Sequence, residues 1–120
     1  MKCLVWNVRG LNDPLKQKVV ARIKKLNINL VCLLETRVKQ NKMTDIIQTR
    51  FPNWNVLHNY SEAYNGRIWI LWTSAMTVNM LASSDQSITY CIEICLQNFF
   101  FSAIYGCNDG IDRRKLGMHL

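Results

Sequence analysis

The stretch Leu4–Gly10, with the sequence LVWNVRG, decides the fold of this chain, because it is an apolar, β-prone run that carries one polar residue near its carboxyl end. Two later stretches have the same design, namely Leu33–Arg37 (LLETR) and Ser102–Asn108 (SAIYGCN). Proteins with mixed sheets usually assemble their sites at the carboxyl ends of strands. The first candidates for a functional site are therefore the polar residues at these ends, which are Asn7, Glu35, Tyr105 and Asn108.

The size and composition of the chain describe one globular domain. With 120 residues there is no room for a second core, so the expected domain covers residues 1–120. Apolar residues make up 49% of the sequence and charged residues 19%, which separates the chain from disordered tails. The net charge of +7 favours a polyanionic partner such as nucleic acid, although many basic side chains only keep a surface solvated.

The cysteines favour a reduced, intracellular protein with buried thiols. There are five of them, an odd number without a C-x-x-C pair, and most fall within apolar runs. A zinc site is not expected, because His58 and His119 have no ligand spacing with any cysteine pair. The sequence shows neither a signal peptide nor an apolar run long enough to cross a bilayer, so we expect no membrane partner.

Apolar patterning predicts helices mainly in the first half of the chain. The first begins at Asn12–Pro14, where a capping residue precedes a proline, and runs to about Leu26 with Leu15 and Ile23 on its apolar face. Its lysines are interpreted as a solvated face rather than as a DNA contact. The other expected helices are Met43–Phe51 and the start of a third at Ile111–Leu120.

Strands account for most of the remaining sequence. The best defined is Ile88–Leu96, in which apolar and polar residues alternate, and Gln97–Asn98 is expected to turn the chain into the next strand as a tight antiparallel hairpin. The other expected strands are Lys2–Val8, Leu30–Leu34, Trp54–His58, Ile68–Trp72, Thr77–Ala82 and Phe99–Tyr105.

This order of elements predicts the α+β (mixed α/β) class, with about one β-sheet and helices on one face. The strand Ile68–Trp72 is apolar on both faces and therefore belongs between two layers. The available residues provide no second layer in this interpretation. We therefore expect an open, apolar sheet face through which the chain would self-associate.

Five stretches carry a resemblance to a known family, and they are Trp6–Asn12, Leu34–Arg37, Asn65–Trp72, Ala103–Asn108 and Asp112–Arg114. In this order they resemble the endonuclease/exonuclease/phosphatase superfamily (DNase-like), most closely the endonuclease domain of plant LINE-type non-LTR retrotransposons. The resemblance implies a partial four-layer α/β/β/α sandwich, of which this chain would hold the N-terminal half. It also implies a Mg²⁺-dependent hydrolase that nicks DNA, with DNA as the partner and a nuclear location.

The resemblance implies a role for each candidate residue. Glu35 matches the glutamate that binds Mg²⁺, a hard cation that needs a carboxylate while water and phosphate fill its other positions. Without the neighbouring stretches, Glu35 would be interpreted as a strand-end carboxylate paired with Arg37 or Lys39. The catalytic matches are Asn7, which orients the site, and Tyr105 and Asn108, which face the scissile phosphate. Nucleic-acid contacts are expected from Arg37, Lys39, Arg113 and Arg114.

The chain also departs from the family pattern. Arg9 stands where some relatives carry an acid, which removes a second metal contact. The family's Gly-Asp-x-Asn and Ser-Asp-His blocks have no counterpart, and neither Ser84–Gln86 nor His119 replaces them. Catalytic acid and base groups contribute roughly 10²- to 10⁴-fold each, so we expect weak Mg²⁺ binding and an inactive chain. The alternatives are a non-catalytic, basic nucleic-acid-binding remnant and a degenerate open reading frame without a function.

Overall fold

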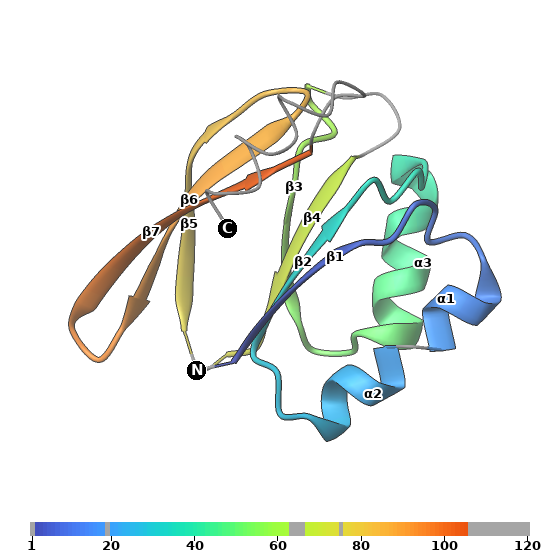
Figure 1. Cartoon of the computed structure of the whole chain (residues 1–120), viewed down its shortest axis with the longest axis horizontal. Helices are drawn as coiled ribbons and strands as arrows, with labels where there is room; N and C mark the ends of the chain where they lie inside the picture. The colour runs from blue at the N-terminus through green and yellow to red at the C-terminus, as the bar shows by residue number, and fades with distance from the viewer. Residues whose placement is uncertain (1, 19, 63–66, 75, 106–120) are drawn as a thin grey trace.

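The computed structural model describes residues 2–18, 20–62, 67–74 and 76–105. The strands form two sheets that face each other, and the helices lie on the outer side of the first sheet (Figure 1). This arrangement confirms the mixed α+β class. The elements in chain order are β1 (Cys3–Asn7), α1 (Pro14–Lys18), α2 (Val20–Lys25), β2 (Leu30–Leu34), α3 (Gln40–Arg50), β3 (Asn55–His58), β4 (Ile68–Trp72), β5 (Thr77–Ser83), β6 (Ser87–Ile94) and β7 (Gln97–Ile104).

Sheet A contains four strands in the order β1-β2-β4-β3. Its first two strands are parallel, and β4 runs antiparallel to both β2 and β3. A parallel pair needs a long crossover connection, which here contains α1 and α2. Because β1 and β2 run in the same direction with Asn7 paired to Leu34, their carboxyl ends lie side by side.

The first expected helix is observed as two short helices, α1 and α2 (Figure 1). The start is as expected, since the Leu15 backbone N–H donates to the Asp13 carboxylate at 2.9 Å. The continuous apolar stripe is a wrong prediction, because Leu15 is 70% exposed and Leu26 is 58% exposed. Only Ile23 of the described apolar positions in these helices is buried, since α1 contributes no buried residue to the core.

Sheet B is an antiparallel meander in the order β5-β6-β7. The tight hairpin is present, but its turn falls at Cys95 and Leu96, with φ values of 50° and 65°. Two positive φ angles are what a two-residue hairpin turn with the right-handed strand twist requires. Gln97 therefore begins β7 and pairs with Ile94 instead of forming the turn.

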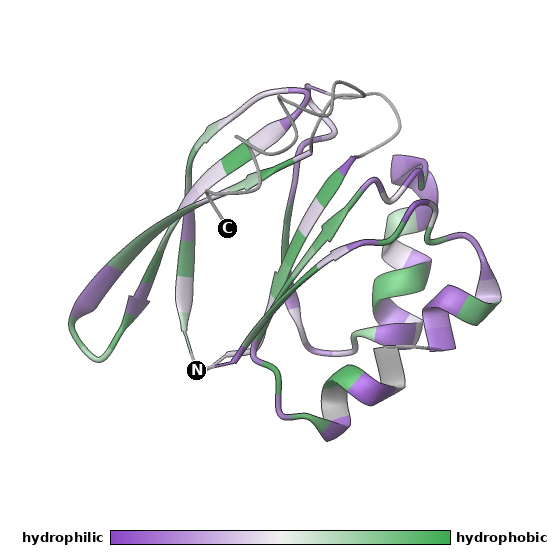
Figure 2. Ribbon diagram, in the orientation of Figure 1, coloured by the Kyte–Doolittle hydropathy of each residue, from purple (hydrophilic) through white to green (hydrophobic). Residues whose placement is uncertain are grey.

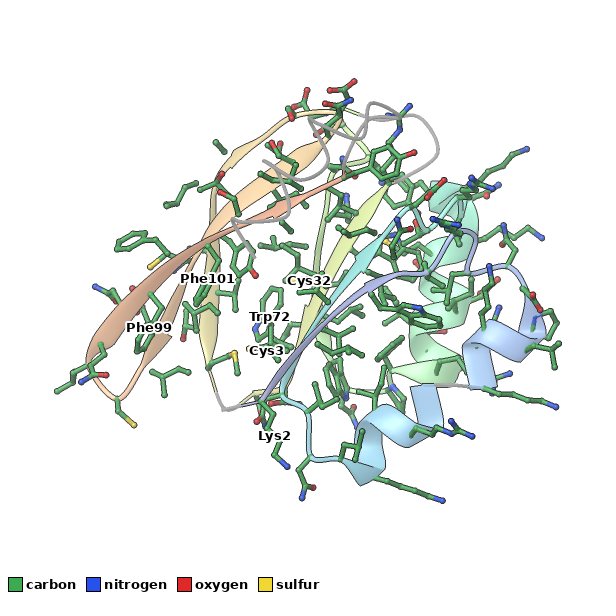
Figure 3. The ribbon with its side chains drawn as sticks, in the orientation of Figure 1. Lys2, Cys3, Cys32, Trp72, Phe99 and Phe101 are labelled. Atoms are coloured by element: carbon green, nitrogen blue, oxygen red, sulfur yellow. The ribbon has the colours of Figure 1, made fainter. Side chains whose placement is uncertain are left out.

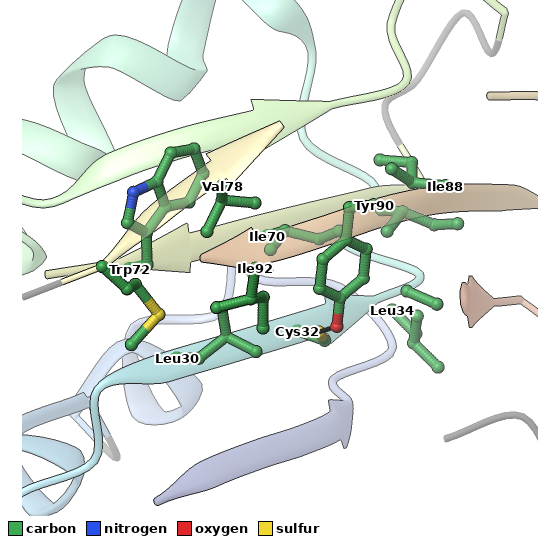
Figure 4. Close-up of a cluster of buried hydrophobic side chains, with 12 residues drawn as sticks. Leu30, Cys32, Leu34, Ile70, Trp72, Val78, Ile88, Tyr90 and Ile92 are labelled. Atoms are coloured by element: carbon green, nitrogen blue, oxygen red, sulfur yellow. Dashed lines mark hydrogen bonds between the residues drawn. The ribbon is translucent and has the colours of Figure 1, made fainter. Parts of the chain in front are cut away.

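The core has two layers, one on each face of sheet A. Figure 4 shows the layer between the sheets, to which β2, β4 and β6 contribute Leu30, Cys32, Leu34, Ile70, Trp72, Ile88, Tyr90 and Ile92. The layer on the helix side contains Val31, Leu33, Trp69 and Leu71 of the sheet with Ile23, Met43, Ile46 and Ile47 of the helices. Figure 2 shows the apolar character of β2 and β4, which are buried on both faces.

The expectation of about one sheet with an open apolar face is therefore corrected. The strands after Trp72 do not extend sheet A; they pair with one another and cover its inner face. The alternation in β6 supplies this cover, because Ile88, Tyr90 and Ile92 all point into the core between the sheets. The face that was expected to drive self-association is thus the interior of the sandwich.

Sheet B covers β1 less fully than β2 and β4. Val5 is 39% exposed and Cys3 is exposed, although both share a face with the buried Cys32. A small apolar pocket of about 40 Å³ lies here, lined by Cys3, Val5, Leu30, Cys32, Tyr90 and Phe101. Figure 3 labels Cys3, Cys32 and Phe101 of this lining. The prediction of buried thiols therefore holds for Cys32 and Cys91 but not for Cys3 or for Cys95 in the hairpin turn. Among the helices of the described residues, none has both the length and the apolar character of a membrane span.

Candidate functional site

Three of the predicted site residues lie at one end of the sandwich. Asn7 ends β1, Glu35 directly follows β2, and Tyr105 directly follows β7. The parallel register places Asn7 beside Leu34, so Asn7 and Glu35 are neighbours across the two strands. Asn7 is exposed, Tyr105 is half-buried and Glu35 is only 8% exposed. The carboxylate is thus the most enclosed of the three side chains.

Arg67 contacts both the backbone directly after Glu35 and the Tyr105 ring. It precedes β4, whose Ile68 pairs with Leu34, and its carbonyl oxygen accepts a hydrogen bond from the Thr36 N–H at 3.3 Å. Its guanidinium carbon lies 5.3 Å from the centre of the Tyr105 ring, within the range of a cation–π interaction. Because Glu35 follows β2 of sheet A and Tyr105 follows β7 of sheet B, Arg67 joins the two sides of the site.

The loop after β1 fixes the backbone around Glu35. The N–H groups of Val8, Gly10 and Leu11 donate to the carbonyl oxygens of residues 34, 35 and 36 at 3.0, 2.9 and 2.8 Å. Gly10 makes this possible with a φ of 101°, which side chains with a Cβ rarely adopt. Glu35 itself has a φ of 57°, a left-handed conformation that costs a non-glycine residue about 1 kcal/mol or more.

The Glu35 carboxylate is paired with Arg37. The Arg37 Nη2 atom donates to Glu35 Oε1 and forms an ion pair, in which the Arg37 side chain is 62% exposed. A carboxylate with little solvent around it needs such a counter-charge. The simple strand-end ion pair considered in the sequence analysis is therefore present.

Arg37 also lines a basic pocket of about 410 Å³ together with Asn12, Lys39 and Lys42. The Asn12 side chain donates to the Arg37 carbonyl oxygen at 3.0 Å, which fixes the loop on which Arg37 stands. Lys39 lies directly before α3, whose first turn contains no acidic residue. The two expected nucleic-acid contacts, Arg37 and Lys39, thus lie together. Lys42 was missed, although it follows Lys39 at helical spacing.

The fit of a divalent cation depends on what surrounds Glu35. In the described part of the chain, no group of three His, Cys, Asp or Glu side chains could hold a metal ion. Mg²⁺ is usually bound by one or two carboxylates, with water and substrate phosphates at its remaining positions. The Glu35 carboxylate fits a site of this kind that substrate completes, and Asn7 lies at the neighbouring strand end.

Asn59 is a buried residue that the sequence analysis missed. Its side-chain amide donates to the carbonyl oxygens of Ser84 at 3.1 Å and Asp85 at 3.3 Å. Its Oδ1 atom accepts from the N–H groups of Arg67 at 3.2 Å and Ile68 at 3.0 Å. Asn59 therefore fastens the start of β4 to the turn between β5 and β6. Asn108, Arg113 and Arg114, and the helix expected at Ile111–Leu120, lie outside the described residues.

Comparisons with known proteins show the fold. No protein-family model and no curated protein matches the chain. Among solved structures, the endonuclease domain of TRAS1, a telomere-specific non-LTR retrotransposon, has a TM-score of 0.67 at 11% identity, over 92% of this chain and 49% of that one. AP endonuclease LMAP from Leishmania major has a TM-score of 0.62 at 15% identity, over 96% of this chain and 43% of that one. The chain shares the fold of these two endonuclease structures and spans about half the length of each.

Proposed function

We propose that this chain provides part of a Mg²⁺-dependent phosphodiesterase site that acts on DNA, derived from a plant LINE-type retrotransposon endonuclease. The observation that carries the proposal is the arrangement of Asn7, Glu35 and Tyr105 at one end of a DNase-like sandwich. The free cysteines of the described residues agree with a reducing, intracellular setting. The nuclear location belongs to the same proposal.

The roles of the residues follow from their chemistry. Glu35 would hold Mg²⁺ together with Asn7, and the bound ion would offset negative charge on a phosphate oxygen. The Tyr105 hydroxyl would donate a hydrogen bond to that phosphate. Arg37 and Lys39 would bind the neighbouring strand backbone. Asn108, Arg113 and Arg114 are included on the resemblance of their sequence stretches.

The chain alone is proposed to be inactive as a hydrolase. Arg37 is already paired with the Glu35 carboxylate, and a metal ion would have to displace it. The second candidate function is therefore non-catalytic nucleic-acid binding, which the basic pocket of Arg37, Lys39 and Lys42 favours.

The test compares the wild-type chain with Glu35→Gln and with a control, Glu93→Gln, an exposed carboxylate next to the far hairpin turn. Mg²⁺ binding is measured by calorimetry with a short DNA duplex present, and nicking is measured on supercoiled plasmid. We expect wild type and Glu93→Gln to bind Mg²⁺ only when DNA is present, and Glu35→Gln not to bind it. Nicking should stay at background level in all three proteins.

Equal Mg²⁺ binding by wild type and Glu35→Gln would contradict the metal site. DNA binding without any bound Mg²⁺ would favour the second candidate function. Nicking that disappears in Glu35→Gln but persists in Glu93→Gln would show that the chain is active alone.

A further inference from the structure

We propose that Arg67 is a phosphate-binding residue of this site and that its ligand is a phosphodiester group of a nucleic acid strand. The inference rests on the proposed function, because it names a further binding residue of the same site. No pattern in the sequence singles out Arg67 for this role. It follows from the contacts of Arg67 with the Thr36 backbone and with the Tyr105 ring, and from the lack of an ion pair between its guanidinium and any carboxylate of the described residues.

The backbone of Arg67 is held on both sides. Its N–H donates to the Asn59 side chain at 3.2 Å, and its carbonyl oxygen accepts from the Thr36 N–H at 3.3 Å. Asn59 is fully buried and is itself anchored to the turn between β5 and β6. The starting point of the Arg67 side chain is therefore fixed relative to both Glu35 and sheet B.

The Tyr105 ring holds the charged end of the side chain. The guanidinium carbon lies 5.3 Å from the ring centre, and the ring face attracts the cation. This contact restricts a long side chain that would otherwise sample many rotamers, so less entropy is lost when a ligand binds. A guanidinium placed in this way keeps its fork of N–H donors for another partner.

Arg67 differs from Arg37 in its charge balance. Arg37 is paired with Glu35, whereas Arg67 makes no ion pair with any carboxylate of the described residues. Arg67 is also exposed, so an incoming anion can reach it. A planar guanidinium forms paired hydrogen bonds with phosphate oxygens. The positive charge of Arg67 would attract a phosphate that approaches this end of the sandwich.

The test measures binding without any metal. A fluorescently labelled DNA duplex is titrated in EDTA at several salt concentrations, and fluorescence anisotropy gives the binding constant. The proteins are wild type, Arg67→Gln, Arg67→Lys and the control Arg50→Gln, a cation of α3 that is bonded to Gln17 at 3.3 Å. Because Arg67 is exposed, we expect all four to unfold at similar temperatures.

Removing one phosphate contact should lower the slope of log Kobs against log salt by about 0.9. We expect this change in Arg67→Gln, with about tenfold weaker binding at moderate salt. Arg67→Lys keeps the charge and should keep the slope, with a smaller loss of affinity. Arg50→Gln should leave the slope unchanged. If Arg67 had only a structural role, its replacement would not change the slope by the amount that one phosphate contact contributes.

An unchanged slope in Arg67→Gln, or the same loss in Arg50→Gln, would overturn the assignment, and so would a wild-type chain that does not bind the duplex. The result is separable from the metal proposal, because EDTA removes divalent cations. If Glu35→Gln left Mg²⁺ binding unchanged while Arg67→Gln lost its phosphate contact, the metal site would be refuted and Arg67 would remain a phosphate-binding residue.

Discussion

The Tyr90 hydroxyl lies 3.3 Å from the Sγ atom of Cys32, and the two atoms form a polar contact inside the apolar core between the sheets (Figure 4). Burial raises the pKa of the Cys32 thiol to about 11. Burial also raises the pKa of the Tyr90 phenol, and the neighbouring Cys32 raises it further. Both groups are therefore neutral near physiological pH, and one hydrogen can be shared between them.

The first prediction concerns alkaline pH. In the unfolded chain the Cys32 thiol loses its proton near its ordinary pKa of 9.0, whereas in the folded chain it keeps the proton to about 11. The folded state therefore binds more protons in this window. The contribution of Cys32 to the free energy of unfolding is fully present below pH 9 and is lost as the pH rises toward 11. A difference of two pKa units corresponds to a loss of about 3 kcal/mol in the free energy of unfolding.

Urea unfolding at a series of pH values measures this effect. In Cys32→Ala the decrease should be shallower, and the part that remains belongs to Tyr90, Tyr60 and Cys3, because burial raises the pKa of each of these groups as well. An equally steep decrease in Cys32→Ala would contradict the prediction.

The second prediction concerns Asn59. Replacing it by alanine leaves two backbone N–H groups and two carbonyl oxygens without their partner. Because unpaired buried polar groups cost about 1–3 kcal/mol each and some of these will reach water, we expect a loss of about 3 kcal/mol in urea unfolding. Asn79→Ala, at an exposed position of β5, is the control and should change stability little. A similar effect of the two substitutions would contradict the role of Asn59.

The third prediction concerns the Tyr60 hydroxyl, which donates to the Val38 carbonyl oxygen at 2.6 Å and accepts from Trp69 Nε1 at 3.1 Å. Tyr60→Phe keeps the ring but leaves the buried indole N–H and the carbonyl unpaired. We expect the free energy of unfolding to fall by about 2 kcal/mol. Urea unfolding monitored by tryptophan fluorescence measures this change. Tyr105→Phe, at a half-buried ring, should cost much less. Equal stability of Tyr60→Phe and wild type would refute this prediction.

The fourth prediction concerns the ion pair of Glu35 with Arg37. A divalent cation must displace Arg37 from the carboxylate, so Arg37→Gln should strengthen metal binding. The Arg37 side chain is 62% exposed, and such pairs contribute up to about 1 kcal/mol, which is about a fivefold change in affinity. Titration with Mn²⁺ in the presence of DNA, followed by electron paramagnetic resonance, measures the change. Lys39→Gln is the control, and no gain in Arg37→Gln over Lys39→Gln would contradict the competition.

The strands and the α+β class could be predicted from the sequence, but the packing of one sheet against the other could not. Alternation in Ile88–Leu96 shows which face is buried, yet it contains nothing about which other face covers it. For that reason sheet B was not recognised as the second layer over β4. The start of α3 was also placed too late, because its N-terminus at Lys39 has no side-chain cap that would mark it.

The same limit applies to the site. The proximity of Asn7 and Glu35 could be predicted from the sequence, because parallel strands with a helical crossover end at the same edge of a sheet. Arg67 and Asn59 could not, since the interactions that define them reach Tyr105 and the turn at Ser84 and Asp85 across the two sheets. Such long-range contacts have no periodic signature in a single sequence.

The division of the strands also sets an order during synthesis. Sheet A uses the chain up to Trp72, and sheet B uses Thr77 onward, so each sheet is made from one continuous segment. As the chain leaves the ribosome, the inner face of β4 emerges before β6, which will cover Ile68 and Ile70. In the interval before β6 emerges, this apolar face is bare and is open to aggregation or to a chaperone.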